Sequence, residues 1–388
     1  MNLTVTHFFA CCALLTTSYL TALSYAADQN TNIQMGGQPV LTATRTRSGE
    51  GAQFLSIELL PGRGMNTFQI RAYVPGTGEV DLLQSPSVEE AQQKLSGGSD
   101  DKFGNAAFGL GGAFLVPYAN RIRGKLAPDG QGIEATIMGR TVSLPANWKG
   151  KNPGAELHSM HGLILASKMD KFSSNKTADG GVVTALVHAG DFGGHWLSQT
   201  DLNFKATLSV GAIDLEVTAR NVGKEPEPMG IGWHPWFAIL SGDRTQAKLH
   251  IPAKMRVEVN NYDDVFPSGK LLPTAGTDFD FTAAAGKTLA KQYLDDNFTD
   301  LQRSANGAPE VTLADPAAKY GLRVIALSRQ ILAFQVYAPP EKPVVAIEPQ
   351  FNLVDPFNPA WGKTNTGMVT LKPGQSVTYH VRLELFTP

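Results

Sequence analysis

The sequence predicts an all-β protein built from large antiparallel sheets, and three observations support this prediction. Short runs rich in β-branched and aromatic residues recur along the chain, and several of them alternate apolar with polar side chains. This period of two residues is typical of a strand that buries one face. Glycine and proline, with 39 and 24 residues, are frequent enough for many turns. The strand-like runs do not alternate with amphipathic helices, so we expect no parallel sheet.

The composition indicates a globular chain with a sizeable core. Of the 388 residues, 42% are hydrophobic and only 18% are charged, which excludes a disordered chain, a coiled coil and a collagen-like chain. The formal net charge is -2. A chain of this charge offers no electrostatic footprint for nucleic acid or for an anionic membrane surface, so we expect neither as a partner.

The first 26 residues are expected to be a signal peptide that does not belong to the fold. They contain no Asp, Glu, Lys or Arg, and an apolar stretch runs from about Phe8 to Tyr25. The small residues Ser24 and Ala26 suit signal peptidase, with cleavage before Ala27. Because the segment before the apolar stretch carries no Lys or Arg, an uncleaved membrane anchor is the alternative interpretation.

Both cysteines, Cys11 and Cys12, lie inside this segment. The mature chain, residues 27–388, would then contain no cysteine, which excludes disulfides, thiolate catalysis and metal sites with Cys ligands. An exported chain without a free thiol fits the bacterial periplasm, where a stray thiol is at risk of oxidation. We therefore expect a periplasmic protein that has no membrane contact once the signal peptide is removed.

Residues 27–388 are expected to form a single domain, whose strands begin near residue 35. No internal repeat or long linker divides this region. Two neighbouring runs, Phe204–Val210 and Ile213–Arg220, alternate most clearly, and Gly211-Ala212 between them is the expected hairpin turn. The expected strands are Leu41–Thr46, Phe54–Leu60, Thr67–Val74, Val182–His188, Phe204–Val210, Ile213–Arg220, Leu322–Ser328, Ile331–Tyr337, Val344–Ile347 and Val377–Phe386.

One short helix is expected at about Val88–Leu95. Ser87 stands at its N-cap position and Glu90 follows three residues later, which is the spacing of a capping box. Ser96–Asp101 follows as a loop. Phe266–Lys287 is rich in Gly, Pro, Thr and Ala, and we expect a long surface excursion there.

The histidines outside the signal peptide are the first candidates for chemistry. His250 and His380 lie inside strand-like runs, and we interpret both as ordinary strand residues. His188 and His195 flank Asp191, but their spacing matches no compact set of metal ligands. We therefore interpret this segment as a hydrogen-bonded loop and expect no metal ion.

Four other segments place polar or ionisable residues beside aromatic residues, glycine or proline. They are Pro117–Ile122, Leu157–Gly162, Gly230–Phe237 and Ala346–Gln350. Aromatic faces combined with a few fixed hydrogen-bonding groups suit a sugar, whose C–H faces stack and whose hydroxyls need partners. Each segment alone also has a plainer interpretation, because His234 could cap a strand before Pro235 and Glu348 could pair with a surface arginine.

The motifs are more informative in their order along the chain. They are Asn120-Arg121-Ile122, His161-Gly162, His234-Pro235-Trp236-Phe237, Leu294-Asp295-Asp296-Asn297-Phe298 and Ile347-Glu348-Pro349-Gln350. This series resembles the aldose 1-epimerase (galactose mutarotase) family over roughly residues 40–386. The resemblance implies a β-supersandwich of two large antiparallel sheets with an open sugar cleft on one side, which agrees with the strand pattern.

The resemblance also implies a role for each matching residue. His234 matches the general acid of the family and Glu348 matches its general base. Arg121 and His161 match residues that bind the substrate. Asp295 matches the carboxylate that accepts hydrogen bonds from sugar hydroxyls.

Several positions in the same motifs complete the expected site or leave its specificity open. Asn120, Trp236 and Gln350 are further expected substrate contacts. Asp296 is the alternative carboxylate if the register differs by one residue. Trp236 stands where tyrosine is commoner, and Leu163 stands where a second glycine is usual, so the identity of the sugar remains open.

The reaction that the resemblance implies is the interconversion of α and β anomers by ring opening and reclosure. It needs no metal and no redox cofactor, so we expect none. Glu348 would take the proton of the C1 hydroxyl, and protonated His234 would donate to the ring oxygen. Ordinary pKa values of about 4.3 for Glu and about 6.5 for His suit these roles near neutral pH.

Other functions remain open at this point. The substrate could instead be a uronate, an oligosaccharide or a hexose phosphate, although no Lys/Arg cluster near the motifs demands phosphate. A catalytically silent carbohydrate-binding protein would not need both His234 and Glu348. A glycosidase is disfavoured because that chemistry usually uses two carboxylates, and only Glu348 lies in a convincing motif.

Overall fold

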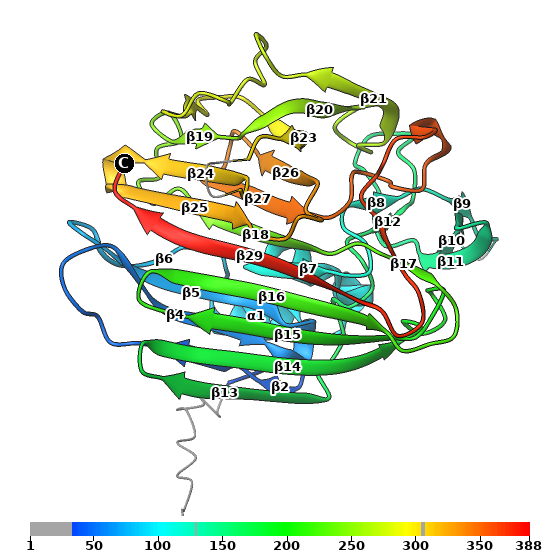
Figure 1. Cartoon of the computed structure of the whole chain (residues 1–388), viewed down its shortest axis with the longest axis horizontal. Helices are drawn as coiled ribbons and strands as arrows, with labels where there is room; N and C mark the ends of the chain where they lie inside the picture. Colours follow the sequence, from blue (N-terminus) through cyan, green and yellow to red (C-terminus); the bar gives the residue numbers. More distant parts are fainter. Residues whose placement is uncertain (1–32, 129, 304–306) are drawn as a thin grey trace, which may run out of the picture.

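The computed structural model describes residues 33–128, 130–303 and 307–388, so the predicted signal peptide lies outside the described residues. Two large antiparallel sheets make up most of the fold (Figure 1). This confirms the predicted fold class. No helix within the described ranges is long and apolar enough to cross a membrane.

The front sheet in Figure 1 has nine strands. In spatial order they are β13 (Lys171–Thr177), β14 (Gly180–Gly190), β15 (Thr200–Leu208), β16 (Ala212–Asn221), β29 (Ser376–Phe386), β25 (Tyr320–Ala326), β24 (Glu310–Asp315), β19 (Lys248–His250) and β22 (Lys287–Thr288).

The rear sheet has eleven strands. In spatial order they are β21 (Pro267–Pro273), β20 (Ala253–Val259), β23 (Leu294–Leu301), β26 (Ala333–Ala338), β27 (Val344–Gln350), β18 (Gly232–Ala238), β7 (Gly112–Leu115), β5 (Asn66–Val74), β4 (Gln53–Leu60) and β3 (Leu41–Thr44), with β6 (Gly78–Asp81) paired to β5.

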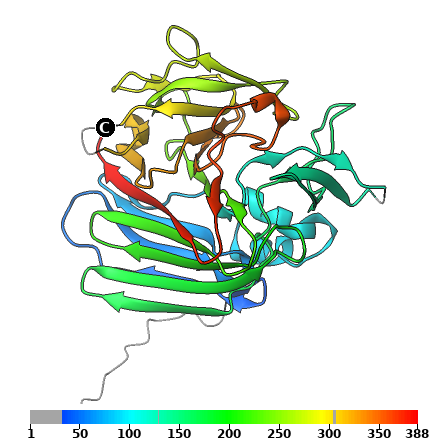
Figure 2. The ribbon, with the colours of Figure 1, turned by 45° about the vertical axis from the view of Figure 1, so that its right-hand side comes forward.

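Smaller elements complete the fold. A three-stranded sheet projects at one end of the molecule (Figures 1 and 2) and consists of β9 (Lys125–Leu126), β10 (Gly132–Ile137) and β11 (Arg140–Pro145). The two-stranded pairs are β1 (Gln34–Met35) with β2 (Gln38–Pro39), β8 (Arg121–Ile122) with β12 (Ser159–Met160), and β17 (Glu227–Met229) with β28 (Val369–Leu371). The helices are α1 (Val88–Lys94) and the 3-10 turns η1 (Pro61–Arg63), η2 (Ser99–Gly109), η3 (Pro316–Ala318) and η4 (Pro359–Trp361).

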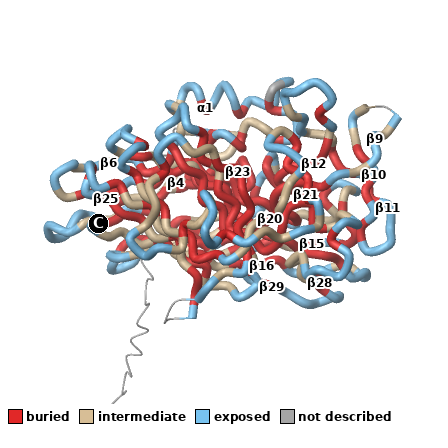
Figure 3. Tube along the Cα trace, turned by 90° about the horizontal axis from the view of Figure 1, so that it is seen from above, coloured by how far each residue is buried: buried red, intermediate tan, exposed pale blue. Residues whose placement is uncertain are grey.

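The main core lies between the two large sheets. Alternate side chains of β15 and β16 are buried, as their sequence pattern predicts, and the intervening ones face outward. Phe204 and Val217 from the front sheet share one apolar cluster with Ile57 and Phe334 from the rear sheet. Each such side chain stabilises the fold by about 1.5–3 kcal/mol through burial. Figure 3 shows the buried residues gathered in the middle and the exposed ones along the periphery.

The predicted strands all overlap observed strands, and His250 and His380 lie in β19 and β29 as expected. The predicted helix is also present, and the Ser87 side chain accepts a hydrogen bond from the Glu90 N–H at its start. The hairpin turn is shifted by one residue from its predicted position. Val210-Gly211 forms the turn, because the Ser209 N–H donates to the Ala212 carbonyl at 2.9 Å.

Two predicted loops are partly wrong. The expected loop Ser96–Asp101 already enters the 3-10 turn η2 at Ser99. The expected surface excursion Phe266–Lys287 contains β21, which pairs with β20 at the border of the rear sheet. Its terminal prolines, Pro267 and Pro273, indicate a turn in the sequence, but an edge strand tolerates proline because one side of it needs no ladder hydrogen bonds.

Candidate active site

The central strands of the rear sheet separate core side chains from the candidate functional residues. In β18, Trp233 and Phe237 enter the main core, whereas His234 lines a cavity on the other side. In β27, Ile347 belongs to the core and its neighbour Glu348 lines the same cavity. The alternation of side chains along a strand therefore places both predicted catalytic residues on one face of the sheet.

The register of the strands aligns these side chains across the sheet. Gly232 pairs with Gln350 and Trp236 with Ala346, which sets His234 opposite Glu348. The next strand, β26, sets Gln335 opposite Glu348. The His234 Nε2 atom lies 3.4 Å from the Glu348 Oε1 atom. The two groups are thus close enough to exchange a proton and to act on neighbouring atoms of one ligand.

A short ladder beside the sheet positions the substrate-binding candidates. In β8 and β12, Arg121 pairs with Met160, and the His161 N–H donates to the Asn120 carbonyl at 2.8 Å. Asn120 and His161 both have a φ of 63°, a left-handed conformation that is uncommon outside glycine and that clusters at functional sites. This backbone geometry brings Arg121 and His161 to the side of the cavity.

The cavity has a volume of about 490 Å³. Among the residues predicted from the sequence, its lining includes Asn120, Arg121, His161, His234, Trp236, Asp295 and Glu348. The structure therefore brings together seven residues from five separate segments of the chain. A cavity of this size is typical of a small-molecule site.

Two of the predicted residues lie behind the cavity. Gln350 is fully buried, and its side-chain N–H donates to Glu348 Oε2 at 2.9 Å. The expected substrate contact of Gln350 is thus replaced by a contact with the carboxylate, because Gln350 is not among the lining residues. Asp296 also turns away, and its carboxylate contacts Arg256 and the Tyr262 hydroxyl, each at 3.1 Å. Of the two candidate carboxylates, Asp295 and Asp296, it is therefore Asp295 that faces the cavity.

A closed network of hydrogen bonds and one ion pair joins the polar residues of the site. Arg121 donates to the Asn120 side-chain oxygen at 2.8 Å and lies 3.7 Å from the Asp295 carboxylate. The Gln335 amide accepts from Asn120 at 3.0 Å and donates to Asp295 at 2.6 Å. Gln335 was not among the residues predicted from the sequence, although a polar residue inside the apolar run Ile331–Tyr337 was the available signal. Gln335 fixes the two groups that flank Arg121.

Burial controls the protonation of the acid–base candidates. Burial is the main cause that lowers the pKa of His234 to about 4; the Arg121 charge acts in the same direction and a backbone hydrogen bond opposes it. Burial raises the pKa of Glu348 well above its ordinary value, and the Asp295 charge adds to this effect, while Arg121 and Gln350 oppose it. The expected pair of protonated His234 and ionised Glu348 is therefore not the favoured state of the empty site. Two neutral side chains are favoured because charges lose water in this cavity.

The neighbouring titratable groups respond to the same environment. Burial lowers the pKa of His161, and the charges of His234 and Arg121 act in the same direction. Burial also raises the pKa of Asp295, although Arg121 and the hydrogen bond from Gln335 oppose this change. The Arg121 charge thus lowers the pKa of each of the four titratable groups around it, His161, His234, Asp295 and Glu348.

The segment around Asp191 forms no comparable site. The His188 ring contacts Asp201 at 2.8 Å, and the His195 ring contacts the Ser143 carbonyl at 2.7 Å. Across the described parts of the chain, no group of three His, Cys, Asp or Glu side chains is arranged to hold a metal ion. The predicted loop is therefore only partly confirmed: His188 belongs to the end of β14, and the turns that carry Asp191 and His195 follow it.

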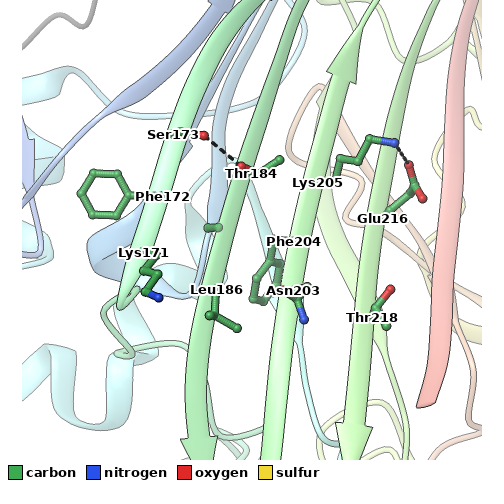
Figure 4. A pocket seen from close by; sticks show the side chains of 11 residues that line it. Lys171, Phe172, Ser173, Thr184, Leu186, Asn203, Phe204, Lys205, Glu216 and Thr218 are labelled. Carbon is green, nitrogen blue, oxygen red and sulfur yellow. Dashed lines mark hydrogen bonds and ion pairs between the residues drawn. The ribbon is translucent and has the colours of Figure 1, made fainter. Parts of the chain in front are cut away.

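A second hollow lies on the outer face of the front sheet (Figure 4). Its polar side chains largely satisfy one another, since the Ser173 and Thr184 hydroxyls are 3.0 Å apart and Lys205 lies 2.8 Å from Glu216. Its charged side chains are exposed or half-buried. We therefore assign the chemistry to the cavity around His234 and Glu348.

Comparison with known proteins gives one family and one fold. The sequence model described as aldose 1-epimerase matches residues 78–384. A galactose mutarotase-like protein from Clostridium acetobutylicum shares the fold with a TM-score of 0.69 and 16% identity, over 90% of this chain and 98% of that chain. An aldose epimerase homologue from C. elegans gives 0.64 and 17%, over 89% and 98%. Galactose 1-epimerase from Lactobacillus acidophilus gives 0.62 and 15%, over 90% and 98%.

Proposed function

Because the chain belongs to the aldose 1-epimerase family, we propose that it is an exported mutarotase that interconverts the α and β anomers of an aldose. The observation that carries this proposal is the pair formed by His234 and Glu348, 3.4 Å apart in one cavity. Export is supported by the apolar, uncharged residues 1–26 and their small residues before Ala27. The reaction itself needs only an acid and a base.

The reacting oxygens of the sugar explain why the acid and the base are neighbours. The C1 hydroxyl oxygen and the ring oxygen O5 are both bonded to C1, so one compact pair of side chains serves both. The Glu348 carboxylate removes the C1 hydroxyl proton while the His234 imidazolium protonates O5, and the C1–O5 bond breaks to give the aldehyde. Rotation about C1–C2 and the reverse proton transfers close the ring on the other face, with no net gain or loss of protons.

The neutral pair of the empty site must first become an ion pair. Hydroxyls of a bound sugar that donate to Glu348 stabilise its carboxylate form. The proton then resides on His234, which lies within reach of Glu348. Each positioned proton transfer of this kind contributes about 10²–10⁴ in rate. Substrate binding thus sets the protonation state that the chemistry requires.

The surrounding residues orient the ring. Arg121 presents a planar set of donors to adjacent hydroxyls, and Asp295 accepts from the hydroxyls that Arg121 leaves free. Trp236 offers an aromatic face beside His234, with ring centroids 5.7 Å apart, and its own N–H is bound to the Phe108 carbonyl at 2.6 Å. These contacts hold C1 against the acid–base pair.

The test is anomer exchange measured by NMR. The purified protein is mixed with glucose, galactose, a uronic acid and a hexose phosphate, and buffer catalysis is subtracted. We expect faster exchange for at least one sugar and its loss in Glu348→Gln. Glu216→Gln, on the front sheet, is the matched control and retains the rate. A folded wild-type protein that binds a sugar without accelerating its exchange would favour a carbohydrate-binding protein over a mutarotase.

A further inference from the structure

The aromatic rings that line the cavity form one continuous chain of contacts. On one side of the acid–base pair, Trp148 contacts Phe108 with ring centroids 5.9 Å apart, and Phe108 contacts His161 at 4.9 Å. His161 then contacts His234 at 4.8 Å. Every ring in this series lines the cavity.

The chain continues on the other side of His234. Trp236 contacts Tyr337 with centroids 5.4 Å apart. Tyr337 contacts Tyr293 at 5.9 Å, and Tyr293 contacts Tyr262 at 5.3 Å. These rings also line the cavity. The aromatic wall thus extends well beyond the residues that a single sugar ring at His234 and Glu348 would contact.

The two ends of this chain are exposed, whereas its middle is buried. Trp148 is 38% exposed and Tyr262 is 40% exposed. His161 and His234, in the middle, are only 7% and 6% exposed. The rings therefore run from the cavity rim to the acid–base pair and back to the rim. We call Trp148 and Tyr262 the rim rings.

The rim rings are held in place by backbone and side-chain contacts. Trp148 exchanges backbone hydrogen bonds with His158 at 3.2 and 2.9 Å, and the Tyr262 hydroxyl donates to Asp296 at 3.1 Å. The loops that carry the two rings are also tied together. Asp263 accepts the backbone N–H of Lys151 at 2.8 Å and that of the next residue at 2.9 Å. The rings therefore form a preorganised surface, which reduces the entropic cost of binding a ligand.

We propose that the substrate is the reducing end of a neutral oligosaccharide, an inference that rests on the proposed mutarotase function. The reducing residue lies against His234 and Glu348, and the neighbouring sugar lies against the rim rings. A single ring held by Arg121 and Glu348 leaves the rim rings uncovered, whereas the C–H face of a second sugar fits their apolar surfaces.

The charges of the lining favour a neutral sugar over a phosphorylated one. Three cationic side chains and four carboxyl groups line the cavity, so the cations are not in excess even with Glu348 neutral. Arg121 is already paired with Asp295. The other two cations, Lys149 and Lys151, line the cavity together with Asp263 and Glu341. The cavity lining therefore has no excess of positive charge that would attract an anion. The uncharged hydroxyls of a sugar find both hydrogen-bond donors and acceptors in this lining.

The test compares sugars that share the same reducing residue. Anomer exchange is measured by NMR for glucose and for cellobiose, maltose and lactose, each of which ends in a reducing glucose. We expect kcat/KM for at least one disaccharide to exceed that for glucose by about tenfold, and Trp148→Ala to remove most of this ratio. Trp148→Phe, which keeps a ring, retains it. Phe103→Ala is the matched control, because Phe103 is 37% exposed but does not line the cavity.

A binding measurement separates the two proposals. Calorimetry with Glu348→Gln is expected to show tighter binding of the preferred disaccharide than of glucose, and Trp148→Ala in that background removes the difference. Exchange of glucose at a rate that disaccharides and Trp148→Ala leave unchanged would overturn the oligosaccharide proposal and leave the mutarotase proposal intact. Disaccharide binding that depends on Trp148, without any exchange by the wild type, would overturn the mutarotase proposal and leave the rim rings as an oligosaccharide-binding surface without a reaction. Absence of disaccharide binding in calorimetry, together with no preference in exchange, would also overturn the oligosaccharide proposal.

Discussion

The buried carboxyl of Glu227 makes the stability of the fold depend on pH in a defined direction. Glu227 lies in β17 with no exposed surface, and both of its oxygens accept from the Thr200 hydroxyl, at 3.1 and 2.9 Å. Burial raises its pKa from 4.5 to about 7, although the hydrogen bond from Thr200 opposes the change. The folded state therefore binds this proton more tightly than the unfolded state does.

The sign and size of the effect follow from this difference. Below pH 4.5 the carboxyl is neutral in both states and costs nothing, and the penalty grows as pH rises toward 7, where the folded state also ionises. Each pKa unit is worth about 1.4 kcal/mol, so the ionised group destabilises the fold by about 3 kcal/mol above pH 7. Glu227→Gln removes this penalty. We expect its stability relative to the wild type to increase by about 2–3 kcal/mol between pH 5 and pH 8.

The assay is urea unfolding of both proteins at pH 5 and pH 8, followed by tryptophan fluorescence. Any fixed cost of the new amide is the same at both pH values and cancels from the comparison. Glu225→Gln is the matched control, because Glu225 is exposed two residues earlier in the chain and its charge stays in water in both states. A difference between Glu227→Gln and the wild type that does not change with pH would refute this reasoning.

Two further substitutions probe the framework of the site. Gln335→Leu leaves Asn120 and Asp295 without their shared partner, so we expect a loss of about 1–3 kcal/mol in unfolding free energy and a rise in KM larger than the fall in kcat, measured by anomer exchange. Gly162→Ala forces a Cβ atom to within 2.4 Å of a backbone carbonyl oxygen at a φ of +78°. We expect a loss of about 2–4 kcal/mol and at least about tenfold slower exchange, because His161 is displaced. For either variant, an unchanged midpoint of urea unfolding together with an unchanged rate of anomer exchange would contradict these assignments.

Most strands were predictable from the sequence because the alternation of apolar and polar residues that marks a strand lies within a few neighbouring residues. The alternation in Phe204–Val210 and Ile213–Arg220 reports directly which face of each strand is buried, and the structure has strands at both places. The border strand β21 was missed because its prolines and Gly269 indicate a turn. Only the pairing with β20, a long-range property, shows that an edge strand accommodates them.

The site was predictable only in part. Residues in recognisable motifs, such as His234 and Glu348, do lie together. Gln335 was missed because a glutamine in an apolar strand carries no sign of its partners until the strand register is known. The rim rings Trp148 and Tyr262 were missed because they lie in loops, outside any periodic pattern. The protonation of His234 and Glu348 was misjudged because burial, the largest cause of both pKa shifts, is a property of the whole fold.

The central claim is that His234 and Glu348 act as one acid–base pair, and a double-mutant comparison of anomer exchange tests it most directly. Exchange rates of His234→Asn, Glu348→Gln and the double variant are measured on the sugar that the wild type prefers. We predict that each single variant loses about 10²–10⁴ in rate and that the double variant is no slower than the slower single one, because groups that work as a unit are lost together. Single variants that retain the wild-type rate, or losses that multiply in the double variant, would contradict the account.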